Sequence, residues 1–449
     1  MTTWRPAPIS RLMQPFNDFV HTESAGGVVL VLASAVALGW ANSPWSHVYE
    51  AILHAHIVVD VGIYRIDEPV HYWVNDVVMV LFFFLVGLEI KRELTVGEIN
   101  SVRRAVVPLA AALGGMIAPV AIFFLIVGDP AAQRGWGVPM ATDIAFALGV
   151  TALLGPRVPV GLKVLLLALA IFDDIGAVAV IAVAYTESLA LLPLLVVMLM
   201  LAAMWGCSKG GVRSISVYAV LAIPVWIAAR ESGVHPTLLG VAFGLLTPWE
   251  SWQHPERFAA EADEILTELR VSTGTADERR AQTETVLRLR GLSAEAVAPL
   301  DRMEETLTDW VAFLIVPLFA LANAGVDLRG GVLGEAVSSP LAWGIAAGLL
   351  IGKPAGIVAA TWIAVRLGAE LPAGATWRGI LGVGAVAGIG FTVALFVSQL
   401  AYTDAGLLAQ SKVGIFAGSL VSGVVGYLLL RSLPSGNAER PRLPRIDTR

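Results

Sequence analysis

The sequence contains very little cysteine and few charged residues, and no two of its histidines are spaced as H-x-x-x-H. Cys207 is the only cysteine among 449 residues, which excludes a disulfide framework and any zinc or iron-sulfur site built on several thiolates. Charged residues make up 15% of the chain, where a soluble domain has about 25%. Hydrophobic residues make up 56%, more than a soluble core absorbs, so the composition indicates a membrane protein.

The net charge of −6 is concentrated in one segment. Residues 250 to 309 carry 14 acidic and 7 basic side chains, a net of −7, so the rest of the chain sums to +1. A nucleic-acid-binding domain would instead show a basic stripe or patch. The sequence therefore predicts the lipid bilayer, and no nucleic acid, as a partner.

Several stretches are apolar and long enough to cross about 30 Å of hydrocarbon, which takes ~17 to 25 helical residues. The predicted fold is an all-α polytopic membrane protein with twelve transmembrane helices. The twelve predicted spans are 25 to 42, 70 to 90, 105 to 127, 138 to 154, 164 to 185, 188 to 207, 214 to 229, 232 to 249, 310 to 326, 340 to 365, 379 to 402 and 413 to 430.

The segments between and around the spans complete the predicted organisation. Residues 1–24 form an N-terminal segment, 25–249 hold helices 1 to 8, and 310–430 hold helices 9 to 12. Residues 250–309 form an acidic insert with helical patterns, broken by Ser272-Thr273-Gly274-Thr275. The Pro- and Arg-rich tail 431–449 is expected to be disordered.

Lysine and arginine predict the orientation, because they accumulate in cytoplasmic loops. With the N-terminus inside, 24 basic residues lie in cytoplasmic segments, 5 lie outside, and Lys353 lies within a span. Lys412 is one of the five outside, just ahead of the last span. Both termini are therefore predicted to be cytoplasmic.

Residues 57 to 66 alternate in hydrophobicity around Gly62, within the stretch 43 to 69 that joins the first two spans. This pattern predicts a small external β-hairpin. Such an exposed ribbon is able to add strands to a neighbour's copy.

Four charged residues fall near the middle of predicted spans: Asp143, Asp173, Asp174 and Lys353. Each costs roughly 2.5 to 3.5 kcal/mol on insertion scales, so they must pair or line a wet cavity. A purely structural salt bridge is one reading, but three acids and one base do not neutralise one another.

The acids suit the binding of a small hard cation. Asp173 and Asp174 point about 100° apart on a helix, so one can reach a basic partner while the other faces the cavity. Carboxylates, the Thr142 hydroxyl and backbone carbonyls supply the oxygen ligands that Na⁺ requires. The same oxygens hold either H⁺ or Na⁺, and mutual exclusion produces exchange.

Two spans carry signs of broken helices. Pro139 precedes Asp143 in the span 138 to 154, and the span 379 to 402 contains Gly382, Gly384, Gly388 and Gly390. Paired interruptions in two halves of a transporter are typical of a binding site at the membrane midplane. Tight helix packing is the alternative reading of the glycines. If both helices break, Asp143 balances the positive N-terminal ends and Lys353 the negative C-terminal ends.

Two other functional classes fit less well. A membrane-embedded aspartyl protease needs two aspartates on facing helices, one in a G-x-G-D context, and the sequence has no G-x-G-D. A passive cation channel would need a carbonyl-ring filter, and the sequence has no such motif.

Seven motifs, in order and at matching spacing, resemble the NhaA-type sodium/proton antiporters of bacteria. They are Val86-Gly87-Leu88-Glu89-Ile90-Lys91-Arg92-Glu93-Leu94, Ala141-Thr142-Asp143-Ile144-Ala145-Phe146-Ala147-Leu148-Gly149, Phe172-Asp173-Asp174-Ile175-Gly176-Ala177, Ser232-Gly233-Val234-His235, Ala320-Leu321-Ala322-Asn323-Ala324-Gly325-Val326, Gly352-Lys353-Pro354 and Gly388-Ile389-Gly390-Phe391-Thr392. The resemblance covers about residues 23 to 431, apart from the long 250 to 309 loop.

The resemblance implies a fold and a function. It implies inverted repeats over about 105 to 185 and 340 to 430, with crossed broken helices at 138 to 154 and 379 to 402. It implies a secondary antiporter of the bacterial inner membrane, not an enzyme, which exchanges cytoplasmic Na⁺ or Li⁺ for external H⁺ in sodium extrusion and pH homeostasis. The antiporter needs no cofactor, and homodimers form through the hairpin at about 45–69. If two protons move per Na⁺, the exchange is electrogenic.

The resemblance also assigns roles to residues. Asp173 and Asp174 carry Na⁺, Li⁺ and protons, Lys353 pairs with Asp173, and Asp143 with Thr142 supports the site. Glu304 matches an acid implicated in the pH response, although the histidines that flank it in the family's well-studied member are missing.

A charged cluster lies at the cytoplasmic end of the second span. Glu89 and Glu93 share a helix face with Arg92, so this cluster either attracts cations and senses pH at the entrance or anchors the helix at the interface. His235 is expected to be structural or a mild pH modulator.

Overall fold

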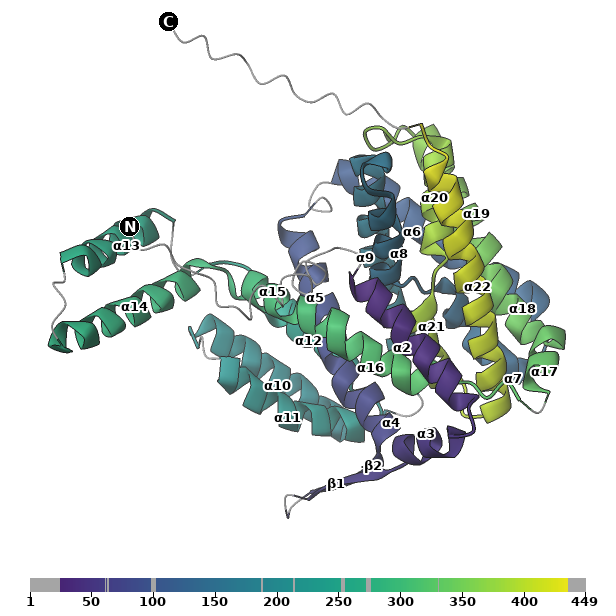
Figure 1. The fold of residues 1–449 in the computed structure, drawn as a ribbon, viewed down its shortest axis with the longest axis horizontal. Helices are drawn as coiled ribbons and strands as arrows, with labels where there is room; N and C mark the ends of the chain where they lie inside the picture. Colours follow the sequence, from purple (N-terminus) through teal and green to yellow (C-terminus); the bar gives the residue numbers. More distant parts are fainter. Residues whose placement is uncertain are drawn as a thin grey trace, which may run out of the picture. The chain divides into compact units, whose positions relative to one another are not determined.

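Helices make up most of the chain in the computed structural model and group into two compact units (Figure 1). The structure describes residues 25–60, 62, 64–97, 102–186, 189–212, 215–251, 255–271, 276–329 and 331–434. The predicted segment 1–24, the break at 272–275 and residues 435–449 of the predicted tail lie outside the described residues.

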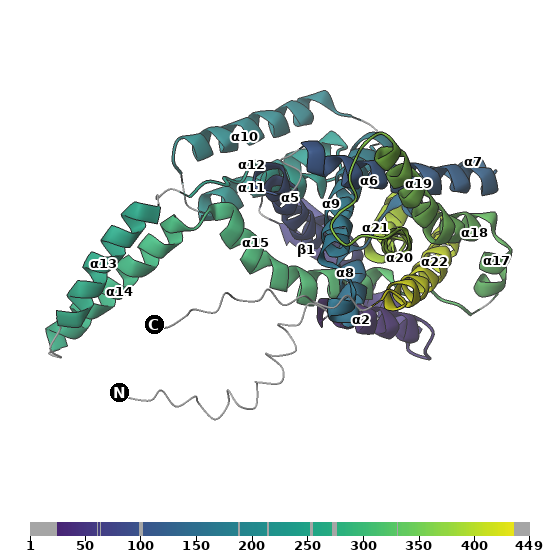
Figure 2. The ribbon, with the colours of Figure 1, turned by 90° about the horizontal axis from the view of Figure 1, so that it is seen from above.

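The first unit comprises residues 1–71, 101–185 and 316–449. In Figures 1 and 2 its long last helix lies beside α18. Its elements are α2 (Ala25–Ala41), α3 (Ser46–Leu53), β1 (His56–Asp60), β2 (Arg65–Pro69), the start of α4 (Val70–Tyr72), α6 (Val102–Ile126), α7 (Pro130–Gln133), η3 (Arg134–Met140), α8 (Ile144–Leu154), η4 (Gly155–Arg157), α9 (Val160–Ala184), α16 (Val316–Asn323), α17 (Val332–Ser338), α18 (Pro340–Ala347), η6 (Gly348–Gly352), α19 (Lys353–Arg366), α20 (Trp377–Ala387), α21 (Phe391–Ala401) and α22 (Ala405–Arg431).

The second unit comprises residues 72–100 and 186–315. It contains η1 (Trp73–Val78), α5 (Met79–Thr95), α10 (Leu191–Lys209), α11 (Ile215–Ser232), α12 (Leu238–Leu246), α13 (Pro255–Val271), α14 (Ala276–Ala296), α15 (Pro299–Trp310) and η5 (Val311–Ile315).

The described residues contain seven helices that are long and apolar enough to cross a membrane, or ten if each of three bent helix pairs forms one span. Two of these pairs coincide with the predicted broken helices: Pro130–Met140 with Ile144–Arg157, bent by 42°, and Trp377–Ala387 with Phe391–Ala401, bent by 46°. Long helices flank each broken one, α6 and α9 around the first, and the continuous helix Pro340–Arg366 and α22 around the second. The order of elements is therefore the same in the two stretches predicted to be repeats.

Several span boundaries differ from the predictions. The first broken helix begins at Pro130 rather than 138, and α12 is shorter than the predicted span 232 to 249. The ninth helix is continuous from Pro299 to Asn323. The sequence placed its first turns, which include Arg302 and Glu304, in the insert. Charges on one face of these turns lower their average hydropathy, whereas Leu300 on the other face is buried.

The last helix also begins earlier than predicted, at Ala405 rather than 413. Asp404 caps it by accepting a hydrogen bond from Leu407 N at 2.8 Å, which explains the start. Lys412 therefore lies inside the helix, with 8% of its surface exposed, and the prediction that it stands in an external loop is wrong.

The β-hairpin predicted around Gly62 is present. β1 and β2 pair antiparallel from His56–Pro69 to Asp60–Arg65, and Gly62 has φ +82°, a left-handed conformation that favours glycine. His56 Nδ1 and Arg65 Nη2 lie 2.8 Å and 3.1 Å from the Asp67 carboxylate, and these hydrogen bonds lower the pKa of Asp67. Part of the preceding stretch forms the helix α3.

Glycines bring α6 and α19 into backbone contact. A Cβ at Gly114 would meet the carbonyl oxygen of Gly356 at 2.2 Å, and a Cβ at Gly356 would meet that of Gly114 at 2.0 Å. Helix association in lipid depends on such close packing, because lipid tails are as apolar as leucine. These glycines hold α19, which begins at Lys353, firmly against α6.

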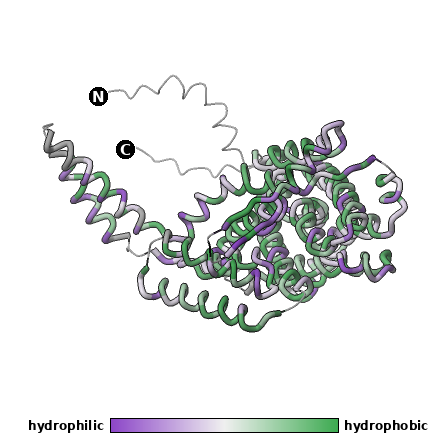
Figure 3. The backbone as a smooth tube through the Cα atoms, turned by 90° about the horizontal axis from the view of Figure 1, so that it is seen from below, coloured by the Kyte–Doolittle hydropathy of each residue, from purple (hydrophilic) through white to green (hydrophobic). Residues whose placement is uncertain are grey.

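Residues 255–271 and 276–296 of the acidic insert are helical, as predicted, and form α13 and α14. In Figure 3 the coloured part of this helix pair alternates between hydrophilic and hydrophobic colours. Neither helix is both long and apolar enough to cross a membrane. The insert is thus a polar helical element added to the second unit.

Candidate functional site

The two helix breaks in the first unit lie against each other. Asp143 N, at the end of the first break, donates a hydrogen bond to Ile389 O in the second break at 2.7 Å. Proline and glycine at these breaks explain why the helical hydrogen bonds stop there. The backbone groups released at each break are therefore available to side chains and to the other break.

Asp143 caps both half-helices that begin at the breaks. Its Oδ1 accepts from Phe146 N in the first turn of α8 at 3.0 Å. Its Oδ2 accepts from Thr392 N at 3.1 Å and from Thr392 Oγ1 at 2.5 Å, at the start of α21. The Asp143 carboxylate, 2% exposed, thus faces two positive helix N-termini, as the sequence predicted.

Lys353 binds the half-helix that ends at the first break. Its side chain is fully buried, and Nζ donates to Asp173 Oδ2 at 2.7 Å, to Thr142 Oγ1 at 2.5 Å and to Met140 O. Met140 is the last residue of η3, so the ammonium group faces the negative end of a half-helix. The ion pair between Lys353 and Asp173 that the resemblance implied is present.

The Thr142 hydroxyl connects these groups. Its oxygen lies 2.6 Å from Asp173 Oδ2 and 3.0 Å from Ala387 O, and its single proton donates to one of them at a time. Ala387 ends α20, so this hydroxyl also faces the second break.

The two oxygens of Asp173 have different surroundings. Oδ2 accepts from Lys353 and Thr142, whereas Oδ1 is buried and has no hydrogen-bond partner among the residues that the structure describes. Asp174, the next residue of α9, is 6% exposed and close enough to Lys353 to interact electrostatically. The first unit therefore buries three carboxyl groups and one ammonium group near the breaks, a net charge of −2 when all four are ionised, which favours protons or cations there.

The remaining predicted residues lie in the second unit. Arg92 Nη1 pairs with Glu304 Oε1 at 2.6 Å, which connects α5 to α15, and Glu89 interacts electrostatically with both. Glu93 follows one turn after Glu89 on α5. His235 lies in the turn between α11 and α12, where its carbonyl accepts from Leu238 N.

Sequence reasoning gave no role to two hydroxyl groups at the breaks. Thr392 binds Asp143 as described, and Ser419 Oγ of α22 accepts from Phe391 N at 3.2 Å. The position of Thr392, two residues after Gly390, was an available signal, because a hydroxyl at a helix start often forms a cap. Nothing in the sequence marks Ser419, whose contact comes from tertiary packing.

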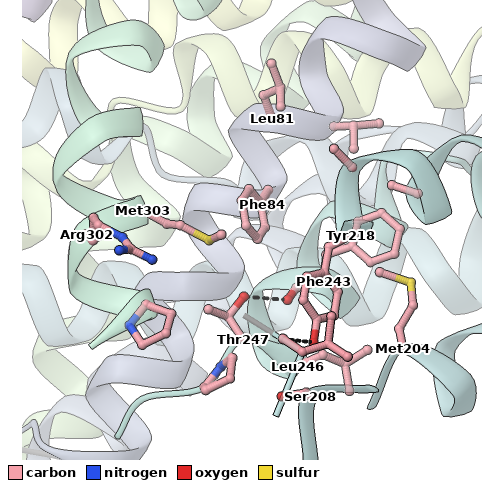
Figure 4. A pocket seen from close by; sticks show the side chains of 16 residues that line it. Leu81, Phe84, Met204, Ser208, Tyr218, Phe243, Leu246, Thr247, Arg302 and Met303 are labelled. Carbon is pink, nitrogen blue, oxygen red and sulfur yellow. Dashed lines mark hydrogen bonds between the residues drawn. The ribbon is translucent and has the colours of Figure 1, made fainter. Parts of the chain in front are cut away.

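An apolar cavity of about 330 Å³ lies within the second unit (Figure 4). Arg302, the one charged residue in its lining, is positive, so the cavity is a poor site for a cation. The labelled lining residues are Leu81, Phe84, Met204, Ser208, Tyr218, Phe243, Leu246, Thr247, Arg302 and Met303.

Comparison with known proteins gives matches over nearly the whole chain. Residues 17–430 match the family described as Na⁺/H⁺ antiporter 1. The Na⁺/H⁺ antiporter NhaA 2 of Sorangium cellulosum is 47% identical over 97% of this chain and 94% of its own length. The NhaA 2 protein of Myxococcus xanthus is 44% identical over 98% and 95%. Among solved structures, the sodium proton antiporter MjNhaP1 from Methanocaldococcus jannaschii matches with a TM-score of 0.49 and 11% identity over 95% of each chain.

Proposed function

Because the chain belongs to the Na⁺/H⁺ antiporter 1 family, and is thus a multi-pass bacterial membrane transporter that exchanges Na⁺ for H⁺, we propose that Asp173 and Asp174 bind the two ions in turn. The protein is not an enzyme and needs no cofactor, since Na⁺ and H⁺ are its transported ions. The alternatives of a membrane-embedded aspartyl protease and of a passive cation channel are therefore wrong.

One observation carries the proposal: Oδ1 of Asp173 is a buried carboxylate oxygen without a hydrogen-bond partner among the described residues. Asp173 belongs to the same turn of α9 as Asp174. Na⁺ requires several oxygen ligands, which these carboxylates and the carbonyls released at the breaks are able to supply. A proton on either carboxylate removes a ligand charge, so Na⁺ and H⁺ compete for the same oxygens. Li⁺ suits the same hard ligands.

Asp143, Thr142 and Lys353 hold the binding oxygens in place. Asp143 neutralises the two helix N-termini, and Lys353 holds Oδ2 of Asp173 so that Oδ1 is directed elsewhere. When Na⁺ binds, the cation and Lys353 compete for the Asp173 carboxylate. Release of two protons from these carboxyl and ammonium groups then accompanies the binding of one Na⁺.

The exchange is proposed to be electrogenic, with two protons moving against one Na⁺. Each turnover then moves one net charge, and 100 mV contributes about 2.3 kcal/mol per charge. In everted vesicles, Na⁺ addition should dissipate the pH gradient, and the rate should change when valinomycin and K⁺ clamp the voltage at different values. Rates independent of voltage would contradict the charge count, and failure of Na⁺ to move protons at all would contradict the exchange.

Twelve spans with both termini in the cytoplasm remain our proposed topology. The seven long helices and three bent pairs would supply ten spans, and α11 and α12 the other two. The excess of Lys and Arg on one side favours the placement of that side in the cytoplasm. In this orientation the protein moves Na⁺ out of the cell and H⁺ inward.

Cys207 tests this orientation. It is half-buried in the last turns of α10, close to Lys209, and the proposed topology makes it reachable only from the cytoplasm. A membrane-impermeant maleimide should label everted vesicles and spare intact cells, with Cys207→Ser as the control for background labelling. Labelling in intact cells alone would reverse the topology.

The hairpin at about 45–69 is the proposed contact for a homodimer. Ile57, Val58 and Val59 of β1 are exposed, and an unpaired strand edge with apolar side chains readily adds strands from another chain.

Glu89, Arg92, Glu93 and Glu304 are proposed as the pH-responsive group, with His235 as a minor modulator. The Arg92–Glu304 ion pair gives this group a physical basis, because it connects α5 to α15.

A further inference from the structure

Lys412 is a buried charge that the proposed mechanism does not use. It lies in the second turn of α22, and its Nζ is 3.5 Å from Gly325 O, just beyond the C-terminus of α16. A lysine near a helix C-terminus is favourable, but a charge inside a membrane span is expensive and is commonly found along ion pathways. Lys412 therefore calls for a functional explanation as well as a structural one.

Three polar side chains accompany Lys412 at this end of the first unit. Asn323 Nδ2 donates to Phe319 O at 2.9 Å, so its Oδ1 is directed to the other neighbours. That oxygen accepts from Gln399 Nε2 at 2.9 Å and lies 2.9 Å from His71 Nε2, which must carry a proton because a carbonyl only accepts. His71 also interacts electrostatically with Lys412. We call His71, Asn323, Gln399 and Lys412 the second polar cluster.

The second polar cluster is aligned with the ion site along α21. Thr392, Phe396 and Gln399 have the spacing i, i+4 and i+7, so they share one helix face, and Gln399 is about 10 Å along the axis from Thr392. Phe396 packs against Phe319 of α16, with ring centroids 6.2 Å apart, and both rings are buried. An aromatic pair thus stands between the two polar regions.

The helix α22 repeats this spacing. Ser419, which binds Phe391 N beside the second break, is two turns from Lys412. Along both α21 and α22, the second polar cluster therefore lies about two helical turns from the second break, on the far side of the aromatic pair. A chain of polar group, apolar constriction and polar group is the arrangement expected of a closed passage that opens when helices move.

We propose that the second polar cluster lines the external half of the ion pathway, and that the positive charge of Lys412 weakens Na⁺ binding from that side. The inference rests on the proposed function and on its orientation, in which α16 and α21 end at the external face. Na⁺ that approaches from outside meets the Lys412 ammonium before it reaches the carboxylates, since about 10 Å of helix separates Lys412 from Ser419 at the second break. Na⁺ from the cytoplasm reaches the carboxylates first. Lys412 is thus a residue that determines side-dependent affinity.

The test compares the two sides of the membrane. Sodium is added to everted and to right-side-out vesicles, and its half-saturating concentration for proton movement is measured in each. Lys412→Met should lower the value in right-side-out vesicles by roughly three- to tenfold, the effect of one charge across ~10 Å at an effective dielectric constant of about 20, reduced by salt. In everted vesicles the value should change by less than about twofold. Lys412→Arg, which keeps the charge, should resemble wild type.

Two further variants separate charge from folding. Gln399→Glu adds a negative charge to the second polar cluster, beside Asn323, and keeps Lys412, so it should shift the external value in the same direction. Arg431→Met removes a cation from the exposed opposite end of α22 and should change neither value. No shift in Lys412→Met and Gln399→Glu, or equal shifts on both sides, would overturn the role of Lys412. Absence of Na⁺/H⁺ exchange from wild type in both orientations would instead refute the proposed function.

Discussion

Asp174→Asn should abolish Na⁺-driven proton movement, down to the background of vesicles that lack the protein. The substitution removes a cation ligand and a titratable proton together, and it preserves the size of the side chain. Because Lys353 is bonded to Asp173 rather than to Asp174, the Asn variant keeps the buried ion pair and should reach the membrane at near-normal levels. The readout is the pH gradient of everted vesicles, followed by fluorescence dequenching when Na⁺ is added.

Two companion variants sharpen this result. Asp173→Asn should also abolish or greatly weaken exchange, and it should reduce stability because Lys353 loses its partner. Asp404→Asn changes a carboxylate at the exposed start of α22 and should leave exchange unchanged. Wild-type dequenching by Asp174→Asn would refute the assignment of this residue to the site.

Lys353→Met should produce the largest loss of stability among substitutions at the site. The change leaves the Asp173 carboxylate buried without its ion pair and removes hydrogen bonds from Thr142 Oγ1 and Met140 O. Removal of one partner of a buried pair commonly costs about 3 to 5 kcal/mol. The thermal unfolding midpoint of the detergent-solubilised protein should fall well below those of wild type and Asp174→Asn.

A double variant distinguishes the stranded charge from lost packing. Lys353→Met combined with Asp173→Asn removes both charges, and it should be more stable than Lys353→Met alone, since an uncharged pair carries no unpaired ion. A double variant as unstable as Lys353→Met would indicate that packing of the lysine stem, rather than charge pairing, dominates. Neither variant should transport.

The parts of the structure that depend on local sequence were predictable. Apolar runs indicated the membrane helices, while Pro139 and the glycines near 388 indicated the breaks, because each acts on the backbone of its own segment. Gly62 indicated the hairpin turn for the same reason. The charges of Asp143, Asp173, Asp174 and Lys353 stood out because an apolar span makes any ionisable residue conspicuous.

Contacts between segments were beyond local reasoning. The burial of Lys412 depends on the neighbouring α16, which lies far away in the sequence. The earlier start of α22 comes from the Asp404 cap, a local signal that the prediction did not use. The early start of the ninth helix at Pro299 was missed because its buried face is short and its other face is charged. Ser419 has no local signal, since its partner Phe391 is 28 residues away.

The joined helix breaks impose an order on biosynthesis. Thr142 meets Ala387, and Asp143 meets Thr392, across 245 and 249 residues of chain. When the first broken helix leaves the ribosome, the residues that satisfy its free amide and carbonyl groups have not yet been synthesised. Its exposed polar groups must meanwhile stay near water or the insertion machinery, because hydrocarbon does not satisfy them. A truncated chain that ends before residue 387 would therefore contain the aspartates and still lack a formed site, and maturation of the transporter waits for its last three helices.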